Sequence, residues 1–274
     1  MKILFITYAI SQNEYNTFEK LASWMGAEII KGGETPLIQP DIIINLGGTT
    51  SQVGMEKMGI TSNPKRVYYF MGQTKAGGGW ALWEERDQIF NDYFFGYGDM
   101  AQKSDVMIDF LPFPCDVETM PQAKMDFSQG IKICQSLVRF WKKSIIPYRL
   151  LKEAGKELVF ITNLTKEEAI NKMADYHIYI GNYNYGNLGN SEFEAMASGL
   201  CCIGYLKPEV KTMYETLGVD FPFVNITLDI FKTQIINLDQ AKIIAQGKKC
   251  RDWMLANYTH QKLADYWNNK LGLL

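Results

Sequence analysis

The sequence of 274 residues is poor in the residues that build metal sites and disulfide frameworks. Its 2 histidines, His177 and His260, lie far apart, so we expect no dedicated zinc site. Its 5 cysteines are odd in number, include no Cys-x-x-Cys pair and stand mostly in apolar runs. This pattern predicts reduced thiols in a protein core. The start of the sequence runs directly into a strand pattern without a small-residue cleavage site, so we expect a cytoplasmic location.

Long apolar runs and a strong charge are also missing. No window approaches the roughly 18 consecutive apolar residues of a membrane helix, so we expect no transmembrane segment. Residues 1–116 carry 9 basic and 14 acidic residues, a net charge of −5, whereas residues 117–274 carry 19 and 16, a net charge of +3. The second half therefore suits an anionic ligand, and the acidic first half disfavours nucleic acid as a partner without excluding it.

Short apolar segments alternate with segments of helical spacing, which predicts an α/β fold. The loop after the first predicted strand, residues 2–7, has no glycine, so the dinucleotide fingerprint is absent. The predicted strand over 41–46 runs into Gly47 and Gly48, whose backbone would let a phosphate or sugar approach closely. The alternative is a tight strand-to-helix turn, which is the commoner use of glycine at such a position.

The second half repeats this alternation after residues 121–130, a polar segment typical of a linker. A predicted strand over 157–164 contains Asn163 near its end, and Thr165 with Glu168 then forms a capping-box pattern that opens a helix.

Residues 177–205 predict a strand, a glycine-rich loop, a helix opened by Ser191 and closed by Gly199, and a second strand. In an open parallel sheet, such a loop lies at the carboxyl end of its strand, where ligands bind. The N–H groups of the following helix point into the same crevice.

The run SEFEAMASGLCCIGY, residues 191–205, resembles the donor-binding motif of the two-lobed (GT-B) glycosyltransferases. In that family, a Glu followed by Ala-Met-Ala-x-Gly and an apolar strand holds the ribose of a nucleotide sugar, a role that falls here to Glu194. Residues 136–155 resemble the family segment in which an Arg and a Lys three positions later clamp the donor diphosphate. These are Arg139 and Lys142 here.

The resemblance further implies that Gly189, Asn190 and Ser191 offer hydrogen-bond donors to phosphate or sugar, and that Asn163 lies near the nucleotide base. The family motif has a first glutamate eight positions before the second, where this chain has Gly186.

Each of these residues also has a simpler interpretation. Arg139 and Lys142 suit a solvated helix face, and Asn163 suits a turn. Ser191 and Glu194 fit a capping box that binds no ligand.

The resemblance implies two Rossmann-like parallel-sheet lobes with a helical tail crossing back to the first lobe. Residues 1–120 would form the acceptor-side lobe, 121–250 the nucleotide-sugar lobe and 251–274 the crossing helix. The expected activity is sugar transfer from a nucleotide-diphosphate sugar to an unidentified acceptor, with no metal and no further cofactor. We expect a retaining reaction, because the first lobe has no histidine to act as general base.

Two alternatives stay open at this point. One is a degenerate, non-catalytic relative that binds a sugar, a nucleotide or a partner protein. The other is a nucleotide-sugar epimerase, which shares the two-lobed architecture.

Overall fold

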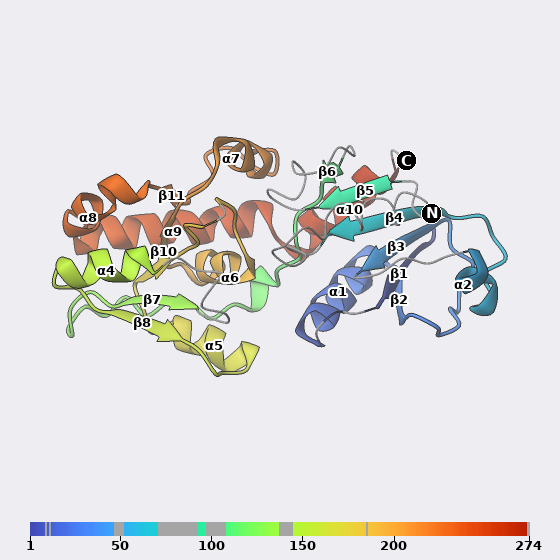
Figure 1. Cartoon of the computed structure of the whole chain (residues 1–274), viewed down its shortest axis with the longest axis horizontal. Helices are drawn as coiled ribbons and strands as arrows, with labels where there is room; N and C mark the ends of the chain where they lie inside the picture. The colour runs from blue at the N-terminus through green and yellow to red at the C-terminus, as the bar shows by residue number, and fades with distance from the viewer. Residues whose placement is uncertain are drawn as a thin grey trace. The chain divides into compact units, whose positions relative to one another are not determined.

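The structure is a computed structural model that describes residues 1–8, 10, 12–46, 52–70, 93–96, 108–136, 145–184 and 186–272. Its contacts divide the chain into a first unit, Met1–Pro114 with His260–Leu274, and a second unit, Cys115–Thr259. Each unit holds a parallel sheet with helices, which confirms the predicted α/β fold class (Figure 1). The division into residues 1–120, 121–250 and 251–274 stays a prediction.

The first unit is built on a sheet of parallel strands in the order β2-β1-β3-β4-β5-β6. The strands are β1 (Ile3–Thr7), β2 (Glu28–Lys31), β3 (Ile42–Leu46), β4 (Lys65–Phe70), β5 (Tyr93–Gly96) and β6 (Ile108–Phe110). The described helices are α1 (Gln12–Met25), α2 (Gln52–Lys57) and α10 (His260–Gly272). Strands β1 and β3 are buried along their whole length, as expected for continuous apolar runs in a parallel sheet.

The C-terminal helix α10 completes the core of the first unit by packing against α1. Trp267 of α10 is fully buried, with its ring 6.1 Å from that of Phe5 and 5.0 Å from that of Tyr69, centroid to centroid. Its indole Nε1 donates to the carbonyl oxygen of Pro112 at 3.1 Å, which satisfies the one polar atom of a buried ring.

The second unit holds a parallel sheet in the order β11-β10-β9-β7-β8. The strands are β7 (Ile133–Ser136), β8 (Leu158–Ile161), β9 (Ile178–Ile180), β10 (Cys201–Gly204) and β11 (Val224–Asn225). The described helices are α4 (Ile146–Glu153), α5 (Lys166–Met173), α6 (Asn190–Ser198), α7 (Pro208–Glu215), α8 (Leu228–Ile236) and α9 (Gln240–Asn257). Helices α6 and α9 pack against each other, and both contact β10.

Two predicted helix ends of the second unit are confirmed. Thr165 and Glu168 form the predicted capping box before α5, with Oε2 of Glu168 accepting the N–H of Thr165 at 2.8 Å. Gly199 ends α6 in a left-handed conformation with φ of 85°, which glycine adopts without steric cost.

The prediction that residues 121–130 form a plain linker is wrong. The N–H of Ala123 donates to the carbonyl oxygen of Ser198 at 2.7 Å, and the N–H of Lys124 donates to that of Ala174 at 2.8 Å. Ser198 is the last residue of α6, and Ala174 is the C-cap of α5. The last carbonyl groups of a helix lack partners within the helix, so this segment supplies them with donors and becomes part of the second unit.

Candidate functional site

Each sheet has one place where the strand order reverses, and this is where ligands bind in open α/β sheets. In the second unit, the reversal lies between β7 and β9, beside the carboxyl ends at Ser136 and Ile180. Arg139 and Lys142 follow Ser136 closely in sequence but lie outside the described residues. Their predicted role as a diphosphate clamp therefore stays a prediction.

The reversal in the first unit lies between β1 and β3, which end at Thr7 and Leu46. Here the N–H of Tyr8 donates to the carbonyl oxygen of Leu46 at 3.0 Å. Gly47 and Gly48 follow Leu46 directly and also lie outside the described residues. The sequence position of this pair thus suits a ligand contact, which remains a prediction.

Buried polar side chains cross-link the carboxyl ends of β7 and β9. Nε2 of Gln135 donates to the carbonyl oxygens of Ile180 and Gly181, each at 3.2 Å. Tyr179 is fully buried, and burial raises the pKa of its hydroxyl well above the ordinary value. Hydrogen bonds with Ser191 and with the backbone of Ser136 lower this pKa in part, and they connect Tyr179 to the start of α6 and to the end of β7. The strand ends and the start of α6 therefore form one fixed frame.

The start of α6 is organised by Glu192, a glutamate that the sequence analysis does not single out. Gly189 is the N-cap, and its N–H donates to Oε2 of Glu192 at 2.9 Å. Ser191 Oγ donates to the same oxygen at 3.4 Å. Asn190 begins the helix, and its Oδ1 is buried without a hydrogen-bond partner among the described residues.

The interpretation of Ser191 and Glu194 as a capping box is therefore wrong, and so is the prediction that Ser191 opens the helix. The cap lies two residues earlier, at Gly189, and Glu192 occupies the third helical position. Because glycine has no side chain, only the glutamate half of the box exists here.

Glu194 points to the neighbouring helix instead of its own backbone. Its Oε1 lies 3.3 Å from Nζ of Lys166, the first residue of α5, and its side chain is 11% exposed. Burial raises the pKa of the Glu194 carboxyl, Lys166 lowers it and Glu192 raises it further, with a net upward shift. Sequence reasoning missed Lys166, and its position directly after the capping residue Thr165 was the available signal.

Gly186, the position of the missing motif glutamate, has no room for a side chain. Its φ is 65°, and a Cβ atom there would lie 2.6 Å from Cγ and 3.2 Å from the backbone nitrogen of Lys207. Its carbonyl oxygen accepts the N–H of Lys207 at 3.0 Å, which holds the two segments together. A glutamate at this position would require the backbone to move.

Asn163 lies just beyond the end of β8 and is exposed. Its φ is 58°, a left-handed conformation that Asn tolerates better than most residues, so the geometry supports the turn interpretation. A contact between Asn163 and a nucleotide base stays a prediction.

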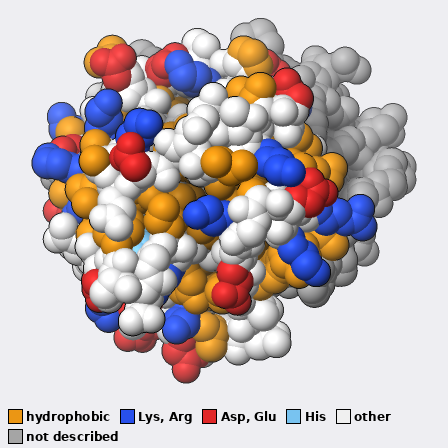
Figure 2. Space-filling model, turned by 90° about the vertical axis from the view of Figure 1, so that its left-hand side faces the viewer, with side chains coloured by type: hydrophobic (Ala, Val, Ile, Leu, Met, Phe, Trp, Pro, Cys, Tyr) orange, Lys and Arg blue, Asp and Glu red, His pale blue; other side chains and the backbone are white. Residues whose placement is uncertain are grey.

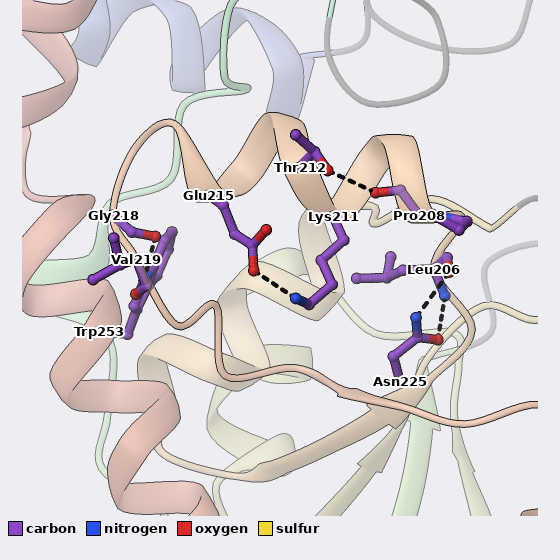
Figure 3. Close-up of polar contacts among 9 residues, drawn as sticks. All are labelled: Leu206, Pro208, Lys211, Thr212, Glu215, Gly218, Val219, Asn225 and Trp253. Atoms are coloured by element: carbon purple, nitrogen blue, oxygen red, sulfur yellow. Dashed lines mark hydrogen bonds and ion pairs between the residues drawn. The ribbon is translucent and has the colours of Figure 1, made fainter.

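The described residues of the second unit also line a groove of about 750 Å³ between α7 and α9. Figure 3 shows two contacts at this groove, the ion pair of Lys211 with Glu215 and the bonds from Trp253 Nε1 to the carbonyl oxygens of Gly218 and Val219. The groove lies beside the segment that enters β11, whereas ligands bind at the carboxyl ends of parallel strands. We therefore do not place the donor in this groove.

The charges on the face of the second unit that Figure 2 draws are mixed. Figure 2 shows basic and acidic side chains interspersed on one face, without a continuous patch of either sign. Within the described parts of the chain, no cluster of three His, Cys, Asp or Glu residues could hold a metal ion. The helices in these parts include none that combines the length and the apolar character needed to cross a membrane.

No protein-family model matches the sequence, and a search of curated proteins finds no match. Solved structures do match. HepE from Anabaena, in complex with UDP-glucose, superposes with a TM-score of 0.63 at 12% identity, covering 100% of both chains. An alpha-glucosyltransferase in complex with UDP-glucose and DNA superposes with a TM-score of 0.63 at 11% identity, covering 99% of both chains.

TarM from S. aureus, in complex with UDP, superposes with a TM-score of 0.56 at 13% identity. That match covers 83% of this chain and 54% of TarM, so this chain spans about half of that protein. Together, these similarities show that the chain has the GT-B glycosyltransferase fold.

Proposed function

We propose that this protein transfers a sugar from a nucleotide-diphosphate sugar to an acceptor, with retention of configuration and without a metal ion. The observation that carries the proposal is the buried carboxylate of Glu194 on α6, the helix that follows β9 at the strand-order reversal. This carboxylate is ion-paired with Lys166 of α5. Glu194 also holds the ribose-binding position of the motif that the sequence resembles. The likeness to structures that contain UDP-glucose supports this choice of donor class.

The described frame suits a diphosphate at the start of α6. The first N–H groups of a helix have no partner within the helix and carry partial positive charge, so they attract an anion. In our proposal, Gly189, Asn190 and Ser191 face the donor, with the N–H groups of Asn190 and Ser191 toward the diphosphate because the N–H of Gly189 is bonded to Glu192. Arg139 and Lys142 neutralise the charge that grows on the leaving diphosphate. Asn163 would approach the base, whereas Gly47 and Gly48 would approach the acceptor side.

We propose a cytoplasmic protein, which the cysteines support. All 5 cysteines lie in the described residues, are buried and form no disulfide. The acceptor is left open by the proposal. Nucleic acid stays a disfavoured acceptor, because the net charge of −5 on residues 1–116 repels a phosphate backbone.

The test measures binding and transfer with a panel of UDP, GDP, ADP and TDP sugars. A donor at a hundred times its dissociation constant should raise the free energy of unfolding by about 2.7 kcal/mol. Arg139→Ala and Lys142→Ala should each weaken binding of that donor by about 1.5–3 kcal/mol, the range for bonds to charged groups. Lack of binding across the panel would contradict the proposal, and binding without transfer or hydrolysis would identify a non-catalytic binder.

A further inference from the structure

The ion pair of Lys166 and Glu194 connects two helices that flank the proposed donor site. Every residue of α6 from Glu192 to Ser198 is buried, whereas Lys166 is 37% exposed at the start of α5. Lys166 bonds one oxygen of the carboxylate, Oε1, and no other described side chain bonds Glu194. The second oxygen thus remains available to a ligand.

Two charged groups face Glu194 in the described structure, and they act in opposite directions. Lys166 from α5 favours the carboxylate, and Glu192 of the same helix disfavours it, as burial does. A buried carboxyl group whose only cation is removed takes up a proton, because the neutral form costs far less to bury. Among the described residues, Lys166 is therefore the cation that favours the ionised state of Glu194.

We infer that Lys166 is a positioning residue that keeps Glu194 ionised and aimed for ligand binding, an inference that rests on the proposed function. A carboxylate accepts hydrogen bonds from two ribose hydroxyls, whereas a protonated acid has lost part of that capacity. Lys166 also fixes the rotamer of Glu194 through Oε1, so the carboxylate meets the ribose without further ordering.

The test compares Lys166→Met with Lys166→Arg and with the control Lys172→Met. Lys172 lies on the same helix and pairs with Asp175 at 3.7 Å, away from Glu194. Calorimetry measures the affinity for UDP-glucose at about pH 6 and about pH 8, a range in which its diphosphate diester does not titrate.

We expect Lys166→Met to weaken binding about tenfold or more at the lower pH and to recover part of the loss at the higher pH, where Glu194 ionises. Lys166→Arg should restore wild-type affinity, and Lys172→Met should leave affinity unchanged. Unchanged affinity in Lys166→Met at both pH values would overturn the inference.

A double variant separates positioning from direct contact. In the Glu194→Gln background, Lys166→Met should cause no further loss of affinity, because its effect acts through the carboxylate. A further loss of similar size would show that Lys166 binds the ligand directly, which overturns the positioning role.

A measurement without ligand separates this inference from the proposed function. Because the pKa of Glu194 is raised on folding, its contribution to stability falls as pH rises, and loss of Lys166 should steepen that fall. In the Glu194→Gln background, Lys166→Met should no longer change the pH dependence of the free energy of unfolding. If this pattern holds but no nucleotide sugar binds, only the proposed function fails. If the pattern is missing, the inference fails whatever binds.

Discussion

Nε2 of His177 lies 2.9 Å from the carbonyl oxygen of Asp126 and bonds it across 51 positions of sequence. Its Nδ1 accepts the N–H of Lys132 at 3.0 Å, so the proton of the neutral ring is on Nε2. The ring of Phe127 stacks on the imidazole with centroids 4.0 Å apart. These contacts hold the segment before β7 against β9, and they require a neutral imidazole.

The first prediction follows from this neutral ring. Burial lowers the pKa of His177 below its ordinary value of 6.5, although the bond to Asp126 and the charge of Asp126 act the other way and Lys132 lowers it further. At a pH just below about 6.5, His177 is therefore protonated more fully in the unfolded chain than in the folded chain. Proton binding thus favours the unfolded chain, and the free energy of unfolding should fall as pH drops below about 6.5. Chemical denaturation between about pH 5 and 7.5 measures this slope.

The chain offers a matched control, because its only other histidine is His260. His260→Asn should keep the slope, whereas His177→Asn should remove most of it at a cost in stability. A slope that survives in His177→Asn would assign the pH dependence to another group.

The second prediction concerns the cap of α6. Glu192→Ala should lower the free energy of unfolding by about 1–3 kcal/mol, because it removes a buried carboxylate and leaves the half-buried N–H of Gly189 without an acceptor. Glu192→Gln should retain most stability, since its amide oxygen accepts the same bond. The control is Glu168→Ala on α5, an exposed cap that should cost about 0.5–1 kcal/mol. If urea denaturation gives equal, small losses of stability for Glu192→Ala and Glu168→Ala, the burial of Glu192 does not increase the cost of losing the cap.

The sequence predicts those parts of the fold that local patterns decide. Strands β1 and β3 follow from their continuous apolar runs, and the end of α6 follows from Gly199. The shift of the α6 cap could not be predicted in the same way, because both Gly189 with Glu192 and Ser191 with Glu194 have the required spacing of three. Serine is the stronger N-cap residue in general, yet Gly189 is the N-cap of α6.

Contacts between distant segments account for the rest of the site. The pairing of Lys166 with Glu194 depends on α5 packing against α6, which no local pattern encodes. The hydrogen bonds that the N–H groups of Ala123 and Lys124 donate to two helix ends also depend on tertiary structure. Because no local pattern encodes these bonds, the polar segment that contains both residues resembles a linker in the sequence. Arg139 and Lys142 remain known from the sequence motif alone.

The third prediction separates stability from binding at Glu194. Glu194→Gln should change the free energy of unfolding by less than about 0.5 kcal/mol at neutral pH, because removing a buried charge offsets the loss of a partly exposed ion pair. Donor affinity should fall about tenfold, or about 1.4 kcal/mol, since an amide cannot offer two anionic oxygens to the ribose hydroxyls.

Calorimetry and denaturation on the same samples test this prediction, with Glu167→Gln as the control. Glu167 is an exposed residue of the first turn of α5, and its substitution should change neither quantity. Unaltered donor affinity in Glu194→Gln would remove Glu194 from the binding site.

The last prediction concerns Gly186, where the structure explains why the motif glutamate is absent. Gly186→Ala must accept both a left-handed backbone and a Cβ atom 2.6 Å from Cγ of Lys207. Gly155 has nearly the same φ, 68°, but nothing within 4 Å of its Cβ position. Gly155→Ala should therefore cost only the backbone strain, about 1–2 kcal/mol, whereas Gly186→Ala should cost about 1–3 kcal/mol more from crowding.

Restoring the glutamate tests the same geometry from the functional side. Gly186→Glu should lose at least as much stability as Gly186→Ala and should gain no donor affinity, because the added side chain must first displace the backbone of Lys207. Urea denaturation of the three variants gives the stability difference, and calorimetry with the donor gives the affinity. Equal losses in Gly155→Ala and Gly186→Ala, or tighter donor binding in Gly186→Glu, would show that Lys207 yields easily and that the position can accommodate the motif residue.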